Sequence, residues 1–238
     1  MVIPKLIHYC WLSDDPYPKK IQHCLNSWEK VIPDYEFMLW DKSRIDINEI
    51  PWVKEAYEAK MYAFAADYIR LYALYNFGGI YLDSDVEVLR RFDDLLDLPY
   101  FIGGESFNDR VECAAFGAVQ GMPWIKDCLS YYKDRHFINK DGEMDKTVMP
   151  SIVNGVISNK YSINLITRKE EFDYKSTVFN IFPNDWFCAN VHKSANDFEP
   201  TYIISPQTYC VHHFANSWVK VNRFKLGLKK LLLRILKQ

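Results

Sequence analysis

Short apolar runs alternate with amphipathic stretches from the start of the chain. The runs predict three strands, at Lys5–Trp11, Tyr35–Trp40 and Ile80–Leu82. The stretches, with apolar residues at helical spacing, predict two helices, at Ile21–Val31 and from about Trp52 to Phe77. The second helix runs into Gly78 and Gly79, a residue type that commonly ends helices. This alternation predicts an α/β sheet with helices on its faces, in which the earliest strand is expected to be central.

After Arg91 the pattern is weaker. We expect strands at Phe101–Gly104 and Ala114–Val119, a helix at Trp124–Tyr132, a polar loop at Lys140–Asp145 and a cluster of short strands between Ser162 and Val211. No internal repeat, linker or change of composition divides the chain before residue 219. The sequence therefore predicts one domain over residues 1–218, followed by a helical appendage over residues 219–238.

The C-terminal stretch is basic and amphipathic. Its seven bases, with no acid among them, are Lys220, Arg223, Lys225, Lys229, Lys230, Arg234 and Lys237. Subtracting these charges from the total of −2 leaves −9 on the preceding residues. Its apolar residues repeat at helical spacing, at Val221, Phe224, Leu228, Leu231, Leu232 and Ile235. Such a helix can lie on an anionic membrane surface, or it can dock on the parent domain or a partner. We expect no nucleic acid partner, because the bases are confined to this helix.

The amino-acid composition excludes several classes of protein. The 238 residues are 49% apolar, 16% aromatic and 25% charged, which excludes a disordered chain and a fibrous repeat. The six cysteines are scattered singly, as in a protein whose thiols stay reduced. The N-terminus lacks the apolar core of a secretion signal, and no run reaches the ~18–20 apolar residues of a membrane span. We therefore expect a cytoplasmic protein, attached peripherally to the inner face of the cytoplasmic membrane if the tail binds lipid.

The stretch with the clearest chemistry is Asp83-Ser84-Asp85, directly after the strand Ile80–Leu82. In a continuing strand the two carboxylates would point to opposite faces, but in a turn they can converge on one hard cation. Ligands of open α/β sheets bind outside the carboxyl ends of the strands. Oxygen ligands there suit Mg²⁺ or Mn²⁺ shared with a substrate phosphate. The alternative is a solvated acidic turn without a ligand.

One apolar face of the preceding helix carries two charged residues. Ala63, Leu71 and Leu74 share this face with Asp67 and Arg70. Because a buried charge is costly unless paired, we expect an Asp67–Arg70 pair. The pair could satisfy only itself, or the guanidinium could also grip a phosphate or a sugar hydroxyl. Only the second interpretation predicts an open pocket beside the pair.

Three segments resemble the signatures of one family of sugar transferases. The central segment is Ala66–Val88 (ADYIRLYALYNFGGIYLDSDVEV), and the outer ones are Ile3–Trp11 (IPKLIHYCW) and Val211–Trp218 (VHHFANSW). In the same order they resemble the DXD-containing transferases grouped with the yeast initiating α-1,6-mannosyltransferase and bacterial capsule and lipopolysaccharide transferases. The catalytic domains of clostridial glucosylating toxins are more distantly similar. The stretch from Phe92 to Pro206 is matched only loosely.

The resemblance implies a GT-A-type single domain, with a Rossmann-like nucleotide-binding half and an acceptor half. The donor-binding residues that it implies are Trp11, Asp67, Arg70, Tyr81, Asp83, Ser217 and Trp218. The metal ligands that it implies are Asp83, Asp85 and His212, and the catalytic residues are Asp83, Asp85 and Arg70. By likeness, Trp11 stacks on the base, and Ser217 and Trp218 close over the diphosphate. The implied cofactor is Mn²⁺ or Mg²⁺, and an imidazole ligand suits Mn²⁺ better.

Two of these residues have a simpler interpretation beside the implied one, and a third has a neighbour of the same type. Trp11 and Tyr81 could fill the core, since aromatic rings are core residues first. His213, adjacent to His212, would point the other way along a strand, so only the likeness favours His212.

The implied function is transfer of a sugar from a UDP- or GDP-sugar donor to a saccharide or lipid-linked glycan acceptor. Surface polysaccharide or lipid-linked oligosaccharide synthesis is the expected setting. The likeness further implies retention of the anomeric configuration, with the departing phosphate taking the acceptor proton, and the sequence identifies no enzymic nucleophile. Glu105, Asn108 and Asp109 are candidates for the acceptor side, although a solvated loop explains them more simply.

Two other functions stay open at this point. A haloacid-dehalogenase-type phosphohydrolase also places DxD after an apolar strand and would use Asp83 as nucleophile. It requires a later acidic motif and a lysine, however, and only Asp93-Asp94 follows, too close to serve. The other function is that of a non-catalytic carbohydrate-binding protein on the same fold. The presence of Asp83, Asp85 and His212 argues against it.

Overall fold

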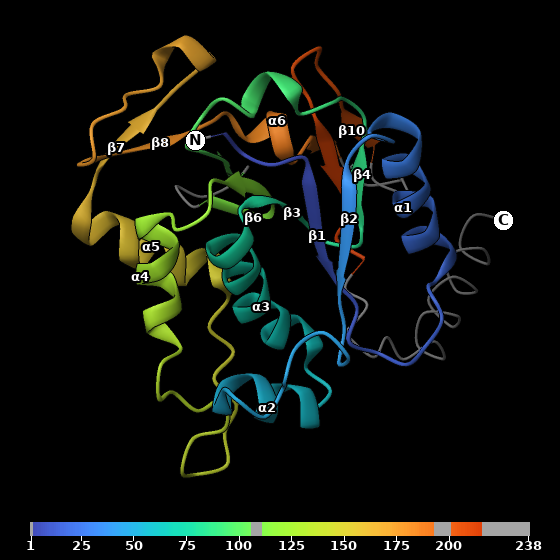
Figure 1. Ribbon diagram of the computed structural model, residues 1–238, viewed down its shortest axis with the longest axis vertical. Helices are drawn as coiled ribbons and strands as arrows, with labels where there is room; N and C mark the ends of the chain where they lie inside the picture. The colour runs from blue at the N-terminus through green and yellow to red at the C-terminus, as the bar shows by residue number, and fades with distance from the viewer. Residues whose placement is uncertain (1, 106–110, 193–200, 216–238) are drawn as a thin grey trace, which may run out of the picture.

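A mixed five-stranded sheet lies at the centre of the computed structural model, which describes residues 2–105, 111–192 and 201–215 (Figure 1). In sheet order the strands are β2 (Glu36–Trp40), β1 (Leu6–Cys10), β3 (Gly79–Leu82), β6 (Val111–Ala118) and β5 (Tyr100–Gly104). β1 runs parallel to both neighbours, whereas β6 is antiparallel to β3 and β5. The expected α/β sheet is confirmed. The earliest strand lies inside the sheet, but β3 holds the middle position.

Helices cover the sheet as the alternating pattern predicts. α1 (Lys19–Val31) connects β1 to β2 and packs on β4 (Val86–Val88). α3 (Tyr62–Phe77) leads into β3 and crosses in front of the sheet in Figure 1. α1 ends before Ile32, the residue that precedes Pro33, because proline disfavours a helical conformation in the residue before it.

The expected continuous helix from Trp52 to Phe77 is wrong. The chain forms two helices there, α2 (Pro51–Glu58) and α3. Between them Lys60 has a left-handed backbone with φ of 58°, which a continuing helix does not allow. The indole Nε1 of Trp52 donates to Phe64 O at 3.0 Å and ties α2 to the first turn of α3. The apolar spacing continues through the turn because both helices bury side chains in the same core.

Two glycines join α3 to β3. Gly78 and Gly79 have φ values of 66° and 107°, where residues with a side chain are rarely found. A Cβ on Gly79 would lie 2.5 Å from Leu6 O of the neighbouring strand β1. The chain can therefore enter the sheet beside β1 only where no side chain stands in the way.

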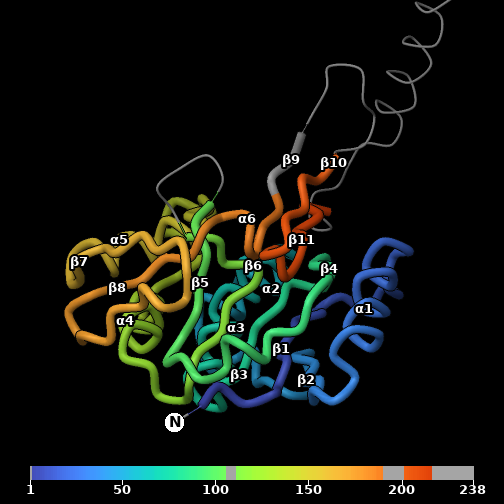
Figure 2. Tube along the Cα trace, turned by 90° about the horizontal axis from the view of Figure 1, so that it is seen from above, coloured from blue at the N-terminus to red at the C-terminus, as the bar shows by residue number. Residues whose placement is uncertain are grey.

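Two further groups of elements flank the sheet (Figure 2). Beside β5 lie α4 (Pro123–Tyr131), α5 (Met149–Lys160) and the parallel strands β7 (Ser162–Leu165) and β8 (Val178–Ile181). In the other group β11 (Cys210–His212) pairs with β4, and β10 (Thr201–Ile203) pairs with β9 (Asn190–His192). The short helices are η1 (Asp93–Leu95), η2 (Lys169–Glu171) and α6 (Asn184–Phe187).

The later expectations are largely confirmed. Both strands expected before residue 120, the helix near residues 124–132 and the short strands after residue 162 are present. The helix α5 is absent from those expectations, since Pro150 and Gly155 weaken its helical pattern. All six cysteines are buried and none forms a disulfide.

Several predictions fall outside the described residues. Ser217, Trp218 and the segment 219–238 lie there, so the division of the chain at residue 218 stays a prediction. Asn108 and Asp109 also lie there. In the described part of the chain, no helix combines the length and the apolar character that crossing a membrane requires.

Candidate active site

The site lies where two neighbouring strands end. β1 and β3 are adjacent and parallel, so Trp11 after β1 and Asp83 after β3 emerge at the same edge of the sheet. The Asp83 amide donates to Ala114 O of β6 at 2.7 Å, which fixes the residue at the end of the ladder.

A tight turn then brings the two aspartates together. The Val86 amide donates to Asp83 O at 2.9 Å and closes a four-residue turn around Ser84 and Asp85. Carboxylate oxygens of Asp83 and Asp85 lie within 4.8 Å of each other and of a ring nitrogen of His212. The two side chains therefore converge, and the strand arrangement that would point them apart does not occur.

His212 reaches this turn through strand pairing. β11 pairs antiparallel with β4, which sets His212 opposite Val86. Its Nε2 lies 3.5 Å from Asp85 Oδ1, and the Ala215 amide donates to Asp85 Oδ2 at 2.7 Å. His213 faces away, with ring nitrogens 2.8 Å from Glu87 Oε2 and 3.1 Å from the Tyr202 hydroxyl. The structure thus separates the two neighbouring histidines as the likeness requires.

Arg70 ties the acidic groups to the sheet. Its Nη2 lies 3.2 Å from Asp67 Oδ1 and 3.1 Å from Asp83 Oδ1. Nη1 donates to Cys113 O at 2.7 Å, and the guanidinium carbon lies 4.6 Å from the centre of the Tyr81 ring. The Tyr81 hydroxyl donates to Asp83 Oδ1 at 3.0 Å. The expected Asp67–Arg70 pair is present and buried, and it extends to Asp83.

Burial and neighbouring charges shift the pKa values of the three aspartates in different directions. Burial raises the pKa of Asp67 to about 7 and also raises that of Asp83, although Arg70 opposes both shifts. Burial also acts on Asp85, but His212 and the Ala215 amide outweigh it and lower the pKa of Asp85 to about 2.

His212 titrates in the opposite direction. Burial opposes its charged form, yet Asp85, Cys188 and Glu112 together raise its pKa well above the ordinary value. The acids on both sides therefore favour the protonated ring, so this place suits a positive charge. Two carboxylates and an imidazole within reach of one another form a donor set that suits Mn²⁺.

An open cavity of about 520 Å³ lies over this cluster. Its wall includes Trp11, Ala66, Arg70, Tyr81, Asp83, Ser84, Asp85, His212 and Phe214. The pair on α3 therefore has a pocket beside it, as only the ligand-gripping interpretation predicts. Asp67 lies behind Arg70 and is not part of the wall.

The two aromatic candidates differ. Trp11 is only partly buried: its Nε1 donates to Asp15 O at 2.9 Å, and its ring lies edge-on to Tyr17 at 4.9 Å. It is therefore a wall residue with a face for a ligand. Tyr81 is 1% exposed and belongs to the core, with its hydroxyl directed to Asp83.

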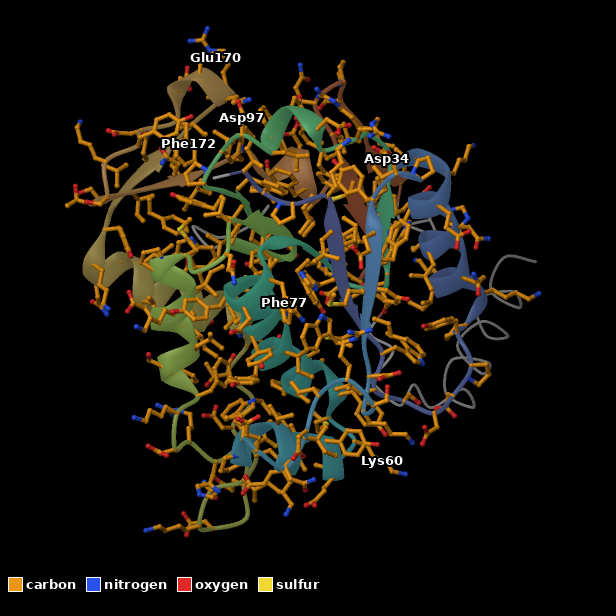
Figure 3. The ribbon with its side chains drawn as sticks, viewed as in Figure 1. Asp34, Lys60, Phe77, Asp97, Glu170 and Phe172 are labelled. Atoms are coloured by element: carbon orange, nitrogen blue, oxygen red, sulfur yellow. The ribbon has the colours of Figure 1, made fainter. Side chains whose placement is uncertain are left out.

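Three residues at the site were missed by sequence reasoning. Lys60 lines the cavity from the turn before α3, and Figure 3 shows Lys60 and Phe77 at opposite ends of that helix. Phe214 lines it after β11, and its ring centre lies 4.0 Å from that of His212. Glu112 lies behind His212. Of these three residues, only Glu112 could have been recognised in the sequence, because it is the one charged residue in the apolar strand 111–118.

The acceptor-side candidates receive little support. Glu105 follows β5 and is not among the residues that line the cavity. Asn108 and Asp109 lie outside the described residues, as do Ser217 and Trp218 of the expected donor set.

Comparison with known proteins points to the segment that carries the turn. Residues 18–102 match the model of the family described as glycosyltransferase sugar-binding region containing DXD motif. Inositol phosphoceramide mannosyltransferase 3 of Schizosaccharomyces pombe is 38% identical over 127 residues, 52% of this chain and 35% of that protein. A mannosyl phosphorylinositol ceramide synthase of Saccharomyces cerevisiae is 31% identical over 147 residues, 58% of this chain and 38% of that protein. The matches thus span little more than a third of these relatives' length.

Solved glycosyltransferase structures share the fold. PaToxG glycosyltransferase superimposes with a TM-score of 0.52 and 18% sequence identity, over 66% of this chain and 70% of that one. The expected resemblance and the expected type of fold are confirmed.

Proposed function

We propose that the protein transfers a sugar from a nucleotide-diphosphate donor to a saccharide or lipid-linked glycan. The match of residues 18–102 to the family of DXD-containing glycosyltransferases supports this proposal. One observation carries the proposal. Asp83, Asp85 and His212 converge at the base of a cavity whose wall also offers a partly buried indole, Trp11, and a buried guanidinium, Arg70. An aromatic face, a cation and a set of metal ligands are the groups that a nucleotide, a sugar phosphate and a divalent ion require.

We assign Asp83, Asp85 and His212 to a divalent cation, with Mn²⁺ favoured over Mg²⁺ by the imidazole. The balance of charge supports this assignment. Four carboxylates, of Asp67, Asp83, Asp85 and Glu112, lie around one guanidinium and one imidazole. When bound, the ion neutralises the negative charge that builds on the departing diphosphate.

The protein's own residues bind and orient the donor. Trp11 offers a ring face on which the base stacks. Arg70 holds the Asp83 carboxylate with its fork of donors and adds a positive charge near the sugar and phosphates. Lys60 lines the same cavity and forms no ion pair among the described residues, which leaves its charge free for a phosphate. Ser217 and Trp218 stay proposed as the residues that close over the diphosphate.

The transfer itself needs no nucleophile from the enzyme. We propose that the acceptor hydroxyl attacks the anomeric carbon on the face that the diphosphate leaves, so that configuration is retained. The departing phosphate oxygen takes the hydroxyl proton. The yeast relatives are named for mannosyl transfer to inositol phosphoceramide, which makes GDP-mannose the first donor to test. For the acceptor we propose a surface polysaccharide or a lipid-linked oligosaccharide.

We further propose a cytoplasmic location, at the inner face of the membrane. The support is the basic amphipathic pattern of residues 219–238 and the absence of an acid within it. An acceptor carried on a lipid would require the enzyme at the bilayer.

Thermal unfolding in the presence of ligands tests the proposal. A panel of UDP- and GDP-sugars, each with and without Mn²⁺, should contain a donor that raises the melting temperature only when Mn²⁺ is present. At 100 times Kd a ligand stabilises the native state by about 2.7 kcal/mol, which such a scan resolves. The absence of any Mn²⁺-dependent shift across the panel would contradict the proposal.

The phosphohydrolase alternative is not favoured. Asp83 would have to act as a nucleophile, yet Oδ1 accepts from the Tyr81 hydroxyl and lies 3.1 Å from Arg70 Nη2. Its Oδ2 lies 3.3 Å from Arg70 Nη1. A carboxylate whose two oxygens both interact with Arg70 and Tyr81 is better suited to holding a ligand than to acting as a nucleophile.

A further inference from the structure

Glu112 is a buried acid that the proposed reaction does not use. It lies on β6, and its side chain is 7% exposed. The register of β5 and β6 shifts between Ile102 and Gly103, where Gly103 lies opposite Glu112. Such an irregularity redirects side chains at a strand edge. Because a buried charge requires partners, the contacts of Glu112 indicate its role.

Those contacts lead to the imidazole. Glu112 Oε1 accepts a hydrogen bond from the Ala114 amide at 2.9 Å and lies 3.3 Å from His212 Nδ1. This nitrogen is buried and makes no aligned hydrogen bond among the described residues. On the other side of the ring, Nε2 lies 3.5 Å from Asp85 Oδ1. His212 is thus held between one acid of the proposed metal site and one acid behind it.

The chemistry of imidazole assigns different roles to the two sides. To give the lone pair of Nε2 to a cation, the neutral ring must carry its proton on Nδ1. That proton is buried and needs an acceptor, and the Glu112 carboxylate lies next to it. Carboxylates in this position orient the histidine ligands of metal sites.

We infer that Glu112 is a positioning residue, which holds His212 with Nδ1–H toward β6 and Nε2 toward Asp83 and Asp85. The inference rests on the proposed function, since it assumes that His212 binds a divalent cation. It adds a residue that lies outside the three segments resembling the family and outside the matched residues 18–102. Glu112 does not touch the ion or the donor and acts only through the ring.

A rival arrangement uses the same atoms. Glu112, Cys188 and His212 also bring one ligand atom each within 4.8 Å of one another. A thiol-containing set of this kind could itself hold a soft cation such as Zn²⁺. The two arrangements make opposite predictions for Cys188, because only the rival arrangement uses its thiol as a ligand.

Mn²⁺ affinity of the full chain, measured by electron paramagnetic resonance of free and bound Mn²⁺, tests the inference. Glu112→Ala should weaken Mn²⁺ binding by about 10- to 100-fold, the range typical for loss of an orienting carboxylate. Glu112→Gln should recover most of the affinity, because its amide oxygen still accepts from Nδ1–H and from the Ala114 amide. Cys188→Ser should bind Mn²⁺ as the wild type does.

The other possible results distinguish failure of the positioning role from failure of the proposed metal site. If Asp85→Asn and His212→Ala weaken Mn²⁺ binding and Glu112→Ala does not, the positioning role is wrong and the metal site stands. If Asp85→Asn and His212→Ala leave Mn²⁺ binding unchanged, the proposed metal site fails and this inference fails with it. If Cys188→Ser weakens binding as much as Glu112→Ala, and bound Co²⁺ shows thiolate charge-transfer absorption, the rival arrangement is correct.

Folding of the variants is followed by thermal unfolding in the same buffers. Should Glu112→Ala not fold, Glu112→Asp replaces it, because its shorter side chain withdraws the carboxylate from Nδ1. Weaker Mn²⁺ binding by the Asp variant than by the Gln variant supports positioning, and wild-type binding by both variants overturns it.

Discussion

Arg70 shows how a single residue links the stability of this protein to its chemistry. It contacts two carboxylates, one carbonyl and one aromatic ring, and its side chain is 7% exposed. Removing it would leave Asp67 and Asp83 without their cation in a buried place. The same guanidinium lines the cavity proposed to bind the donor.

Substitution of Arg70 should therefore affect both properties. Arg70→Ala should lower the free energy of unfolding by about 3–5 kcal/mol, the cost of leaving a buried charge uncompensated. Arg70→Lys keeps the charge but loses the planar fork, and donor turnover should fall by about 10²-fold. Urea denaturation and sugar-transfer assays measure the two effects.

Arg90→Lys is the matched control, because Arg90 pairs with Asp94 at the surface with about 40% of its side chain exposed. Its effect on the free energy of unfolding should stay below about 1 kcal/mol. Wild-type turnover in Arg70→Lys would show that the planar fork is not needed to hold Asp83 for the reaction.

At the level of single residues, part of the site is readable in the sequence. Asp83 and Asp85 follow an apolar strand, and Asp67 and Arg70 interrupt an apolar helix face, so local patterns identify all four. Glu112 cannot be interpreted in this way. Its role depends on the contact with His212, which comes from a strand one hundred residues later in the chain.

At the level of elements, the junction between α3 and β3 positions the acidic turn. Gly79→Ala should lower the free energy of unfolding by about 3 kcal/mol, because φ of 107° and the 2.5 Å approach to Leu6 O both exclude a Cβ. The shift of the urea midpoint measures this loss. Gly155→Ala in α5 is the control: nothing lies within 4 Å of its Cβ, so the variant should gain up to about 1 kcal/mol. Equal stability of the two variants would refute the argument.

A buried histidine in β1 gives the fold a pH dependence. His8 Nδ1 accepts from Trp40 Nε1 at 3.0 Å, so Nε2–H donates to Gly78 O at 2.8 Å and the ring is neutral. Burial lowers its pKa from 6.5 to about 4. Below pH 6.5 the unfolded chain takes up a proton that the native state resists, so stability should fall as the pH drops from about 6.5 to about 4.

The full loss from this group is about 3 kcal/mol at the lower end of that window. His8→Gln cannot titrate, so the difference in unfolding free energy between wild type and variant should change across the window. Urea denaturation at several pH values measures that difference. Parallel pH profiles of the two proteins would contradict a neutral His8.

The sequence predicts elements that depend on local periodicity, and it misses features that depend on contacts between distant segments. The strands and helices of the first half have strong local periodicity, and they are found where expected except that one expected helix is two. The break at Lys60 was missed because apolar spacing continues through the turn and no Gly or Pro marks it. The pairing of β4 with β11 cannot be inferred from periodicity, since it joins segments that are distant along the chain.

On the scale of the whole molecule, the chain combines an acidic body with a basic tail. Deletion of residues 219–238 should release the protein from vesicles that contain anionic lipid, because seven basic side chains each contribute about 1 kcal/mol near such a surface. Vesicle sedimentation measures the bound fraction, and uncharged vesicles provide the control. If the shortened chain sediments as the full chain does, the tail is not a membrane anchor.

The sequence explains the proposed donor site further than the proposed acceptor site. The donor-site residues follow from motifs, because a nucleotide-sugar and its ion require the same chemical groups wherever they bind. No comparable motif marks an acceptor site, and Glu105 is not among the residues that line the cavity. Acceptor choice would depend on the shape of the surface around the cavity, which no short motif encodes.

The central claim is that Asp83, Asp85 and His212 share one divalent ion with a diphosphate. Calorimetric titration of Mn²⁺, with and without the nucleoside diphosphate selected by the thermal panel, tests it most directly. In the wild type each ligand should strengthen binding of the other by the same factor. Asp85→Asn should weaken Mn²⁺ binding by about 100-fold, whereas Asp15→Asn, which lines the same cavity outside the cluster, should not. Independent binding of Mn²⁺ and diphosphate, or unchanged Mn²⁺ affinity in Asp85→Asn, would contradict the claim.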